Sequence, residues 1–256
     1  MIASPTATAT PPDLSVVVPM HDEADNVDPL AREIHAALGD TVEYEIVFVD
    51  DGSTDATAER LAALVEQDAR VRVVRHPARA GQSAATVSGV LAARAPWVAT
   101  LDGDGQNDPA DVPRLLAALR AWSAPRPGLL VGHRRRRHDS FVKRASSRIA
   151  NGVRARVLGD ATPDTGCGLK LFRRDAFLAV PRFDHMHRFL PALFRRDGWD
   201  VRSVEVSHRP RRGGRSHYGM FNRLWVGIVD MAGVWWLARR GVRTADRNEG
   251  RGTGDG

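Results

Sequence analysis

The chain has 256 residues, 43% of them apolar, which is enough for the core of one domain of moderate size. Its single cysteine, Cys167, excludes an internal disulfide, and no signal-peptide pattern follows Met1, so we expect a cytoplasmic protein. The net charge of +6 divides into −9 over residues 1–131 and +15 over residues 132–256, which predicts one part that handles a cation and another that meets anions.

Short apolar runs alternate with helical patterns over the first half of the chain. The runs predict strands at 14–18, 45–49, 71–74, 97–101 and 129–131. Apolar residues spaced three to four apart predict helices at 26–38, 55–67, 82–94 and 110–121. Strands that are apolar on both faces and alternate with helices predict an α/β fold, with a mainly parallel sheet and helices on both sides. Ligands of such sheets bind beyond the carboxyl ends of the strands.

This alternation breaks down after residue 132. The sequence there predicts a helix at 141–158, a strand at 168–172, a helix around 185–196 and a strand at 201–206. The last element, 224–237, has 14 residues and one charge. A bilayer span takes about 20 apolar residues, so this element is too short to cross a membrane alone. We expect residues 1–13 and 241–256 to be disordered tails.

The strongest functional pattern is DGDGQ at 102–106, directly after the predicted strand 97–101. Asp102 and Asp104 lie two residues apart in a turn, where they can present hard oxygen ligands to one Mg²⁺ or Mn²⁺. Gln106 can add a neutral oxygen. The alternative is a simple Asp/Gly turn. The position of DGDGQ at the end of a strand favours a metal site instead.

Three further predicted strands end in polar residues. DDGSTD at 50–55 follows one strand, PMHDE at 19–23 follows another, and RAGQ at 79–82 follows a third. In DDGSTD, Asp55 can cap a helix and Gly52 can form its turn, so this motif also has a purely structural interpretation. Four strand ends that converge on polar residues nevertheless indicate a nucleotide site, although no GxGxxG or Walker loop is present.

Taken together, VVVPMHDE, VDDGSTD and DGDGQNDP resemble the family 2 glycosyltransferases with the GT-A fold. Within that family, residues 14–238 look like the dolichol- and polyprenyl-phosphate sugar transferases. The resemblance implies a catalytic domain at 14–219, with a nucleotide-sugar half at 14–131 and an acceptor half at 132–219. It implies an apolar interfacial helix at 220–240.

The resemblance also implies roles for the residues at the strand ends. Asp51 is expected to contact the base, with Asp50 beside it, and Asp102, Asp104 and Gln106 to hold the metal on the donor diphosphate. The remaining donor-binding residues implied are Pro19, His21, Glu23 and Gly81. The family usually has Asn where this chain has Asp22.

The basic half is implied to bind the phosphate of a lipid acceptor. Its arginine run at 134–137 precedes a predicted helix, and the candidates are Arg134, Lys143, Arg144 and Ser147. A solvated basic face is the plain alternative. Nucleic-acid binding is not expected, because interleaved aromatic residues and the known nucleic-acid-binding motifs are missing.

Three further segments complete the acceptor half. The turn DTGCGLK at 164–170 and the segment HRFLP at 187–191 resemble acceptor-side segments of the family, and Cys167 is expected to be packed rather than reactive. The family pattern Arg-x-x-Gly-x-Ser-Lys is met by Arg211 and Ser216, with a His in place of the Lys. Arg211 is expected to clamp a phosphate group.

The final apolar segment carries tryptophans and is flanked by arginines, which suits the headgroup region of a bilayer. The alternative is a buried terminal helix. Many relatives add transmembrane helices after this point, whereas this sequence ends, so we expect peripheral attachment to the inner face of the membrane, directly or through a membrane protein.

The function implied is the transfer of a sugar, with inversion, from a nucleotide-sugar to polyprenyl phosphate, with Asp104, Arg134, Arg144 and Arg211 as catalytic residues. UDP is preferred to GDP, and the sugar is left open. One rival is a transferase acting on a polysaccharide hydroxyl, which needs a base such as Asp164 or Asp184. The other is a non-catalytic basic module that binds nucleic acid or membrane.

Overall fold

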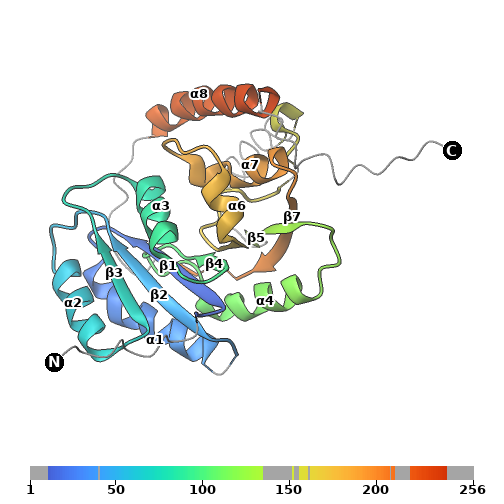
Figure 1. Cartoon of the computed structure of the whole chain (residues 1–256). Helices are drawn as coiled ribbons and strands as arrows, with labels where there is room; N and C mark the ends of the chain where they lie inside the picture. The colour runs from blue at the N-terminus through green and yellow to red at the C-terminus, as the bar shows by residue number, and fades with distance from the viewer. Residues whose placement is uncertain are drawn as a thin grey trace, which may run out of the picture.

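A computed structural model of the chain describes residues 11–39, 41–134, 152, 156–160, 162–207, 209–210 and 220–240. Within these ranges it forms one seven-stranded sheet with the order β3-β2-β1-β4-β6-β5-β7 (Figure 1). The strands are β1 (Leu14–Met20), β2 (Tyr44–Asp50), β3 (Val71–Arg75), β4 (Trp97–Thr100), β5 (Pro127–Arg134), β6 (Lys170–Arg173) and β7 (Asp200–Val206). Only the pairs that involve β6 are antiparallel. The prediction of a mainly parallel α/β fold is confirmed.

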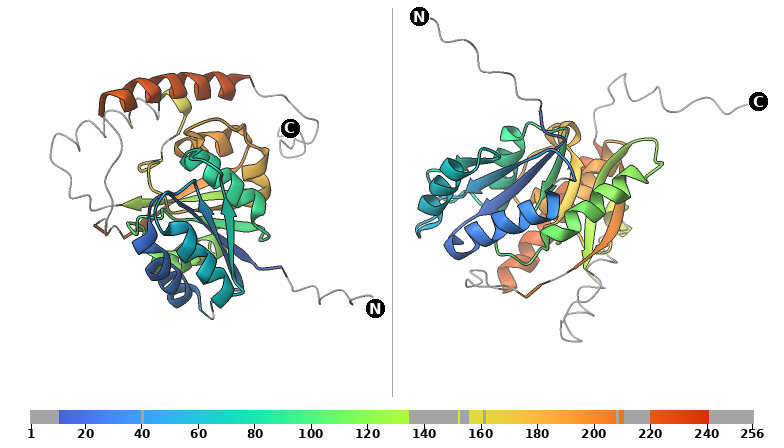
Figure 2. Two further views of the ribbon diagram at one scale, coloured as in Figure 1. Left: turned by 90° about the vertical axis from the view of Figure 1, so that its left-hand side faces the viewer. Right: turned by 90° about the horizontal axis from the view of Figure 1, so that it is seen from below.

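Helices cover both faces of the sheet (Figures 1 and 2). They are α1 (Val27–Leu38), α2 (Thr57–Gln67), α3 (Gln82–Ala92), α4 (Val112–Arg120), α6 (Arg174–Ala179), α7 (Leu190–Arg196) and α8 (Met220–Arg239), with 3-10 turns η1 (Ala24–Asn26), η2 (Pro109–Asp111) and η3 (Met186–Arg188). One core packs α1, α2 and α4 on the sheet, and the other packs α3, α6, α7 and Val234 of α8. Alternation along β1 explains the division, because Val16 and Val18 face the first core and Val17 the second.

Small residues let α3 lie close to the central strands. A side chain at Gly89 would overlap that of Val17 on β1. The close approach brings the start of α3, with Gln82 and Ser83, to the edge of the sheet where β1 and β4 end.

The sequence placed the strands well and the later helices less well. The helix expected around 185–196 is divided at Phe189, which has the non-helical dihedrals φ −110° and ψ 4°, into η3 and α7, and Pro191 falls in the first turn of α7. The left-handed φ of 62° at His185 sets the start of η3. Helix α6 was not predicted. The boundary expected between residues 131 and 132 falls inside β5, so the two halves share one sheet. Most of the helix expected at 141–158 lies outside the described residues, as do 1–10 and 241–256 of the expected tails.

The last helix, α8, lies on the outer side of α7, at the opposite end of the molecule from α1 and α2 (Figures 1 and 2). Its 20 residues extend beyond the apolar run at 224–237 and fall within the helix expected at 220–240. In the described part of the chain, no helix qualifies as a membrane span. Val234 of α8 is buried in the second core, and Arg196 Nε of α7 donates to the carbonyl of Leu237 at 3.0 Å. Helix α8 is therefore packed on one side against the domain.

A buried carboxylate, Glu45, lies at the amino-terminal ends of the parallel strands, on the opposite side of the sheet from the polar motifs at their carboxyl ends. Glu45 on β2 is 1% exposed and accepts hydrogen bonds from Ser15 Oγ at 2.7 Å, from the Arg94 backbone at 2.6 Å and from Arg94 Nε at 2.8 Å. Burial raises the pKa of a carboxylic acid, but these bonds together with one from Arg72 outweigh it and lower the pKa of Glu45.

We expect Glu45→Gln to lower the free energy of unfolding at pH 7 by about 1–3 kcal/mol, because buried N–H donors lose a charged acceptor. A lowered pKa in the folded state stabilises the fold above the ordinary Glu pKa of about 4.3, and this contribution disappears as pH falls through the folded value. Urea unfolding between pH 3.5 and 7 should therefore show a shallower loss of stability at low pH in the variant than in the wild type. Glu59→Gln, at an exposed position on α2, is the control, and equal behaviour of the two variants would contradict the prediction.

Candidate active site

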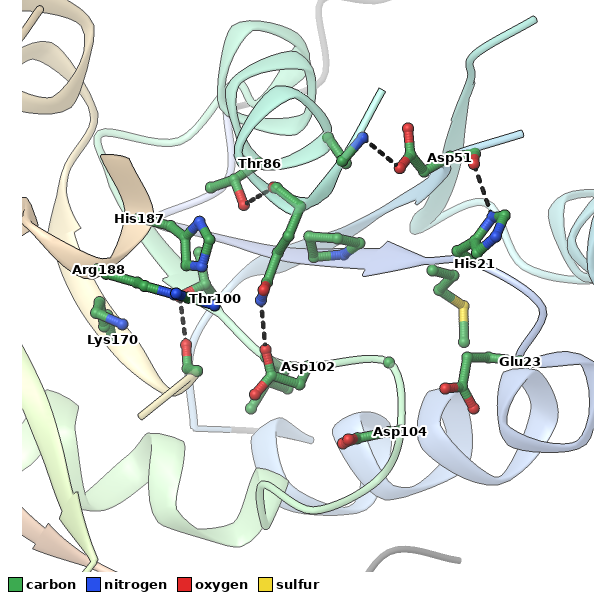
Figure 3. A pocket seen from close by; sticks show the side chains of 18 of the residues that line it. His21, Glu23, Asp51, Thr86, Thr100, Asp102, Asp104, Lys170, His187 and Arg188 are labelled. Carbon is green, nitrogen blue, oxygen red and sulfur yellow. Dashed lines mark hydrogen bonds between the residues drawn. The ribbon is translucent and has the colours of Figure 1, made fainter. Parts of the chain in front are cut away.

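A pocket of about 340 Å³ opens at the carboxyl ends of β1, β2 and β4 (Figure 3). Its walls come from the residues after these strands, from the start of α3, from the turn before β6 and from η3. The register brings these segments together, because Met20 of β1 lies opposite Asp50 of β2, and Val17 opposite Thr100 of β4. The strand-end motifs singled out in the sequence therefore meet in one pocket.

One end of the pocket is built around Asp51, and we call it the Asp51 end. Both carboxylate oxygens are engaged: Oδ1 accepts from His76 Nδ1 and the Ala80 backbone, and Oδ2 from the Gly81 backbone, each at 2.8 Å. Burial favours a higher pKa for Asp51, but these hydrogen bonds lower it overall. A carboxylate has about four acceptor sites, so one remains for a ligand.

The other residues predicted around Asp51 divide into two groups. Pro19, His21, Glu23 and Gly81 line the pocket, and the ring of His21 contacts the Asp51 carbonyl at 2.9 Å. Asp50 does not line it. Its side chain is fully buried, with Oδ1 accepting from the Ser53 backbone at 2.9 Å and Oδ2 lying 3.3 Å from Arg75 Nε. Successive residues of a strand point to opposite sides, so the expected donor-binding role of Asp50 is not supported by its position.

The middle of the pocket holds a pair of carboxylates, Asp102 and Asp104, in the turn after β4. Asp102 Oδ1 accepts from Gln82 Nε2 at 2.8 Å (Figure 3). Burial and the like charge of Asp104 raise the pKa of Asp102 to about 6. A Cβ atom at Gly168 would overlap the Asp102 carboxylate, so only glycine allows the turn before β6 to lie this close.

This pair fits a divalent cation. Its oxygens are hard ligands, and a dication would relieve the repulsion that perturbs Asp102. Among the described residues no group of three His, Cys, Asp or Glu side chains is placed to hold a metal ion. A Mg²⁺ ion bound through one or two carboxylates takes its other ligands from substrate phosphates and water. Gln106 does not line the pocket: its backbone donates to Asp104 Oδ1 at 3.1 Å, and its carbonyl accepts from the Arg209 backbone at 3.1 Å. Its expected role as a ligand is therefore not supported.

The far end of the pocket contains Lys170, His187 and Arg188, and we call it the Lys170 end. Lys170 on β6 is 4% exposed and donates to the carbonyl of Cys167, and burial lowers its pKa. His187 contacts Ser83 Oγ through Nδ1 at 2.7 Å. Burial and the nearby cations Lys170 and Arg188 lower the pKa of His187 to about 3, so its ring is neutral near pH 7.

Sequence reasoning gave these three residues no role of their own. Their segments resemble acceptor-side segments of the family, but a sequence pattern cannot show that β6 is inserted beside β4 and carries Lys170 to the position opposite Thr100. Cys167, expected to be packed, is buried.

The expected acceptor-phosphate residues are placed differently from the donor residues. Arg134 does not line the pocket, and it forms a two-pronged ion pair with Asp164, with Nε–Oδ2 at 2.7 Å and Nη2–Oδ1 at 2.9 Å. The expectation that its guanidinium is available for a phosphate is not supported. The other candidates, Lys143, Arg144, Ser147, Arg211 and Ser216, lie outside the described residues.

The two carboxylates considered as bases for a hydroxyl acceptor are also away from the pocket. Asp164 is 5% exposed and engaged by Arg134, while the side chain of Asp184 is 73% exposed and lies 3.6 Å from His185 Nε2. Neither lines the pocket.

The chain is similar in sequence to known proteins. The model of glycosyl transferase family 2 matches residues 15–180. The chain is 35% identical over 239 residues to a dodecaprenyl-phosphate galacturonate synthase of Rhizobium johnstonii, covering 90% of this chain and 69% of that protein. It is 34% identical over 210 residues to an undecaprenyl-phosphate 4-deoxy-4-formamido-L-arabinose transferase of Edwardsiella ictaluri, covering 81% of this chain and 63%, less than two thirds, of that protein.

Solved structures show the same fold. Glucosyl-3-phosphoglycerate synthase of Mycobacterium tuberculosis, crystallised with Mn²⁺, UDP-glucose and phosphoglyceric acid, superposes with a TM-score of 0.63 at 19% identity. The match covers 91% of this chain and 81% of the other.

Proposed function

Because the chain belongs to glycosyl transferase family 2, we propose that it transfers a sugar from a nucleoside diphosphate sugar to a polyprenyl phosphate. The observation that carries this proposal is the carboxylate pair Asp102 and Asp104 in a pocket that runs from the Asp51 end to the Lys170 end. The named activities of the relatives at 34–35% identity support the choice of acceptor.

The reaction is a single displacement with inversion. An oxygen of the acceptor phosphate attacks the anomeric carbon of the sugar, and the bond from that carbon to the donor diphosphate breaks, so the nucleoside diphosphate leaves with the electron pair. A bound Mg²⁺ or Mn²⁺, held by Asp102 and Asp104, would act as a Lewis acid that neutralises the leaving diphosphate. Asp51 holds the 80–81 loop and leaves one acceptor site for the donor's base.

A phosphate acceptor needs no general base, because its second pKa of about 6 leaves it largely ionised near pH 7. This matches a pocket in which neither Asp164 nor Asp184 is available as a base. The rival acceptor, a polysaccharide hydroxyl, needs such a group. We propose UDP rather than GDP as the donor nucleotide, supported by the Mn²⁺ and UDP-glucose complex of the mycobacterial protein of similar fold.

We also propose that α8 docks on the membrane that contains the acceptor. Its outer side exposes Val229, Trp235 and Trp236 at 54%, 40% and 53%. Arg239 stacks over the Trp235 ring at 4.0 Å and Arg240 over Trp236 at 5.9 Å. Exposed tryptophans beside arginines suit an anionic headgroup layer. The side chains of Arg223 and Trp225, also expected there, lie outside the described part of the chain.

Replacing both Trp235 and Trp236 with alanine should weaken binding to phosphatidylglycerol vesicles at least about tenfold, since two large apolar side chains no longer enter the interface. Vesicle sedimentation at fixed salt measures this. The matched control is Leu91→Ala, which removes an apolar side chain that is 48% exposed on α3. Equal binding of the double variant and the wild type would exclude α8 as the docking helix.

Nucleoside diphosphate release tests the proposed reaction. The protein is mixed with a panel of UDP- and GDP-sugars, Mn²⁺ or Mg²⁺, and undecaprenyl phosphate in detergent. We expect release from a UDP-sugar that needs both the lipid phosphate and the metal and stops when EDTA is added. Release stimulated by a free saccharide and not by the lipid would favour the polysaccharide rival. No turnover of any donor would favour the binding module.

A further inference from the structure

We propose that Arg188 binds the phosphate group of the lipid acceptor, an assignment that rests on the function proposed above. Arg188 belongs to η3 and lines the pocket at the Lys170 end. In Figure 3 it lies with His187 and Lys170 on one side of the carboxylate pair, while Asp51, His21 and Glu23 lie on the other. A ligand that spans the pocket from the Asp51 end across the carboxylates therefore points its far end at Arg188.

Arg134, the arginine expected to bind this phosphate, is already engaged. The guanidinium of Arg134 is paired through two nitrogen atoms with Asp164, and its side chain is only 14% exposed. Opening this pair would break two short hydrogen bonds to a carboxylate that is 5% exposed, which is costly. Phosphate binding by Arg134 would carry that cost, whereas binding by Arg188 does not.

The turn η3 directs two of its side chains, His187 and Arg188, to the pocket. The left-handed residue His185 starts the turn, and its Nδ1 lies 3.0 Å from Asp230 Oδ2 of α8. Met186 and Phe189 are buried in the core, which leaves the two residues between them to face the pocket. His187 is fixed by Ser83 of α3, so Arg188 stands on a turn that is held from both sides.

Among the three basic residues that the structure describes at the Lys170 end of the pocket, Arg188 is the one whose side chain has a free charge. Lys170 is directed at the carbonyl of Cys167, and His187 is neutral near pH 7. Across the described residues, the structure gives the Arg188 side chain no ion pair or hydrogen bond, and its residue is exposed. An acceptor phosphate brings a charge of about −1.5 to −2, and the planar guanidinium can meet two of its oxygens at once.

Direct binding of a soluble polyprenyl phosphate tests the assignment without the need to know the sugar. Isothermal titration measures the Kd of farnesyl phosphate for the full chain saturated with Mn²⁺ and UDP, and the Kd of UDP itself. In Arg188→Gln we expect the Kd of farnesyl phosphate to rise about 10- to 100-fold, the range for loss of hydrogen bonds between charged groups. Arg188→Lys should recover part of the affinity, because the charge stays but the fork is lost.

The control variant is Arg182→Gln, at an exposed arginine six positions earlier that does not line the pocket. It should leave both dissociation constants within about twofold, as surface changes away from a site do. An unchanged Kd for farnesyl phosphate in Arg188→Gln would overturn the role of Arg188 but leave the proposed acceptor standing. So would a weaker Kd for UDP in that variant with no effect on farnesyl phosphate. A wild-type chain that binds UDP but not farnesyl phosphate would overturn the proposed acceptor and, with it, the role of Arg188.

Discussion

Gly168→Ala is expected to lower turnover at least about 100-fold while the protein stays folded, since displacing a catalytic group by about 1 Å has effects of this size. The new methyl group would occupy the space of the Asp102 carboxylate. Asp102 would have to leave its hydrogen bond with Gln82 and its place beside Asp104. The metal site would thus lose its geometry although both carboxylates remain in the sequence.

Two measurements and one control make this prediction specific. The Mn²⁺ concentration that gives half-maximal activity should rise together with the loss of turnover, and urea unfolding should show a cooperative transition close to that of the wild type. Gly166→Ala changes the same turn, but its methyl group would lie 3.8 Å from Arg134 Nη2 and 3.9 Å from Asp164 Oδ1, which are ordinary contacts. Equal activity of the two variants would show that the close approach of Gly168 to Asp102 is unimportant.

Asp51→Asn is expected to weaken UDP binding in the presence of Mn²⁺ by about 10- to 100-fold, from the loss of buried acceptor capacity for N–H donors. An amide group has one oxygen and one NH₂, so at least one of the hydrogen bonds from Ala80 and Gly81 would be replaced by two donors facing each other. The 80–81 loop would move away from the pocket it lines.

The neighbouring Asp50 supplies the control for this variant. It has the same side chain in the next position, but it faces Ser53 and Arg75 rather than the pocket. Asp50→Asn should therefore lower the free energy of unfolding without changing the Kd of UDP. Weakened UDP binding in both variants, or in neither, would contradict the division of labour that the structure gives these two residues.

The sequence was sufficient to predict the Asp51 end of the pocket and the carboxylate pair. Each of these residues follows directly after a parallel strand, and the carboxyl ends of parallel strands meet at one edge. Asp50 and Gln106 were predicted with them but do not line the pocket, because a motif does not tell which of its side chains turn toward it. Strand alternation turns the Asp50 side chain away, and Gln106 lies in the turn after β4 without lining the pocket.

The Lys170 end could not be predicted by the same reasoning. Lys170 begins a strand rather than ending one, and it reaches the pocket because β6 runs antiparallel to β4. His187 and Arg188 depend on a turn whose position is set by long-range contacts, with Ser83 on α3 and with Asp230 on α8 through His185. The pairing of Arg134 with Asp164 likewise joins residues 30 positions apart, which no local pattern contains.

The place of β6 in the sheet also bears on how the chain folds as it is synthesised. Strand β6 lies between β4 and β5, so β4 keeps one open edge until Lys170–Arg173 has left the ribosome. Open strand edges invite pairing with other chains, and sheets closed by distant segments fold slowly. Nascent chains are therefore most prone to aggregate during the interval between the emergence of β4 and that of β6. Translation that pauses in this interval should lower the yield of native protein, and chaperones that cover exposed strands should restore it.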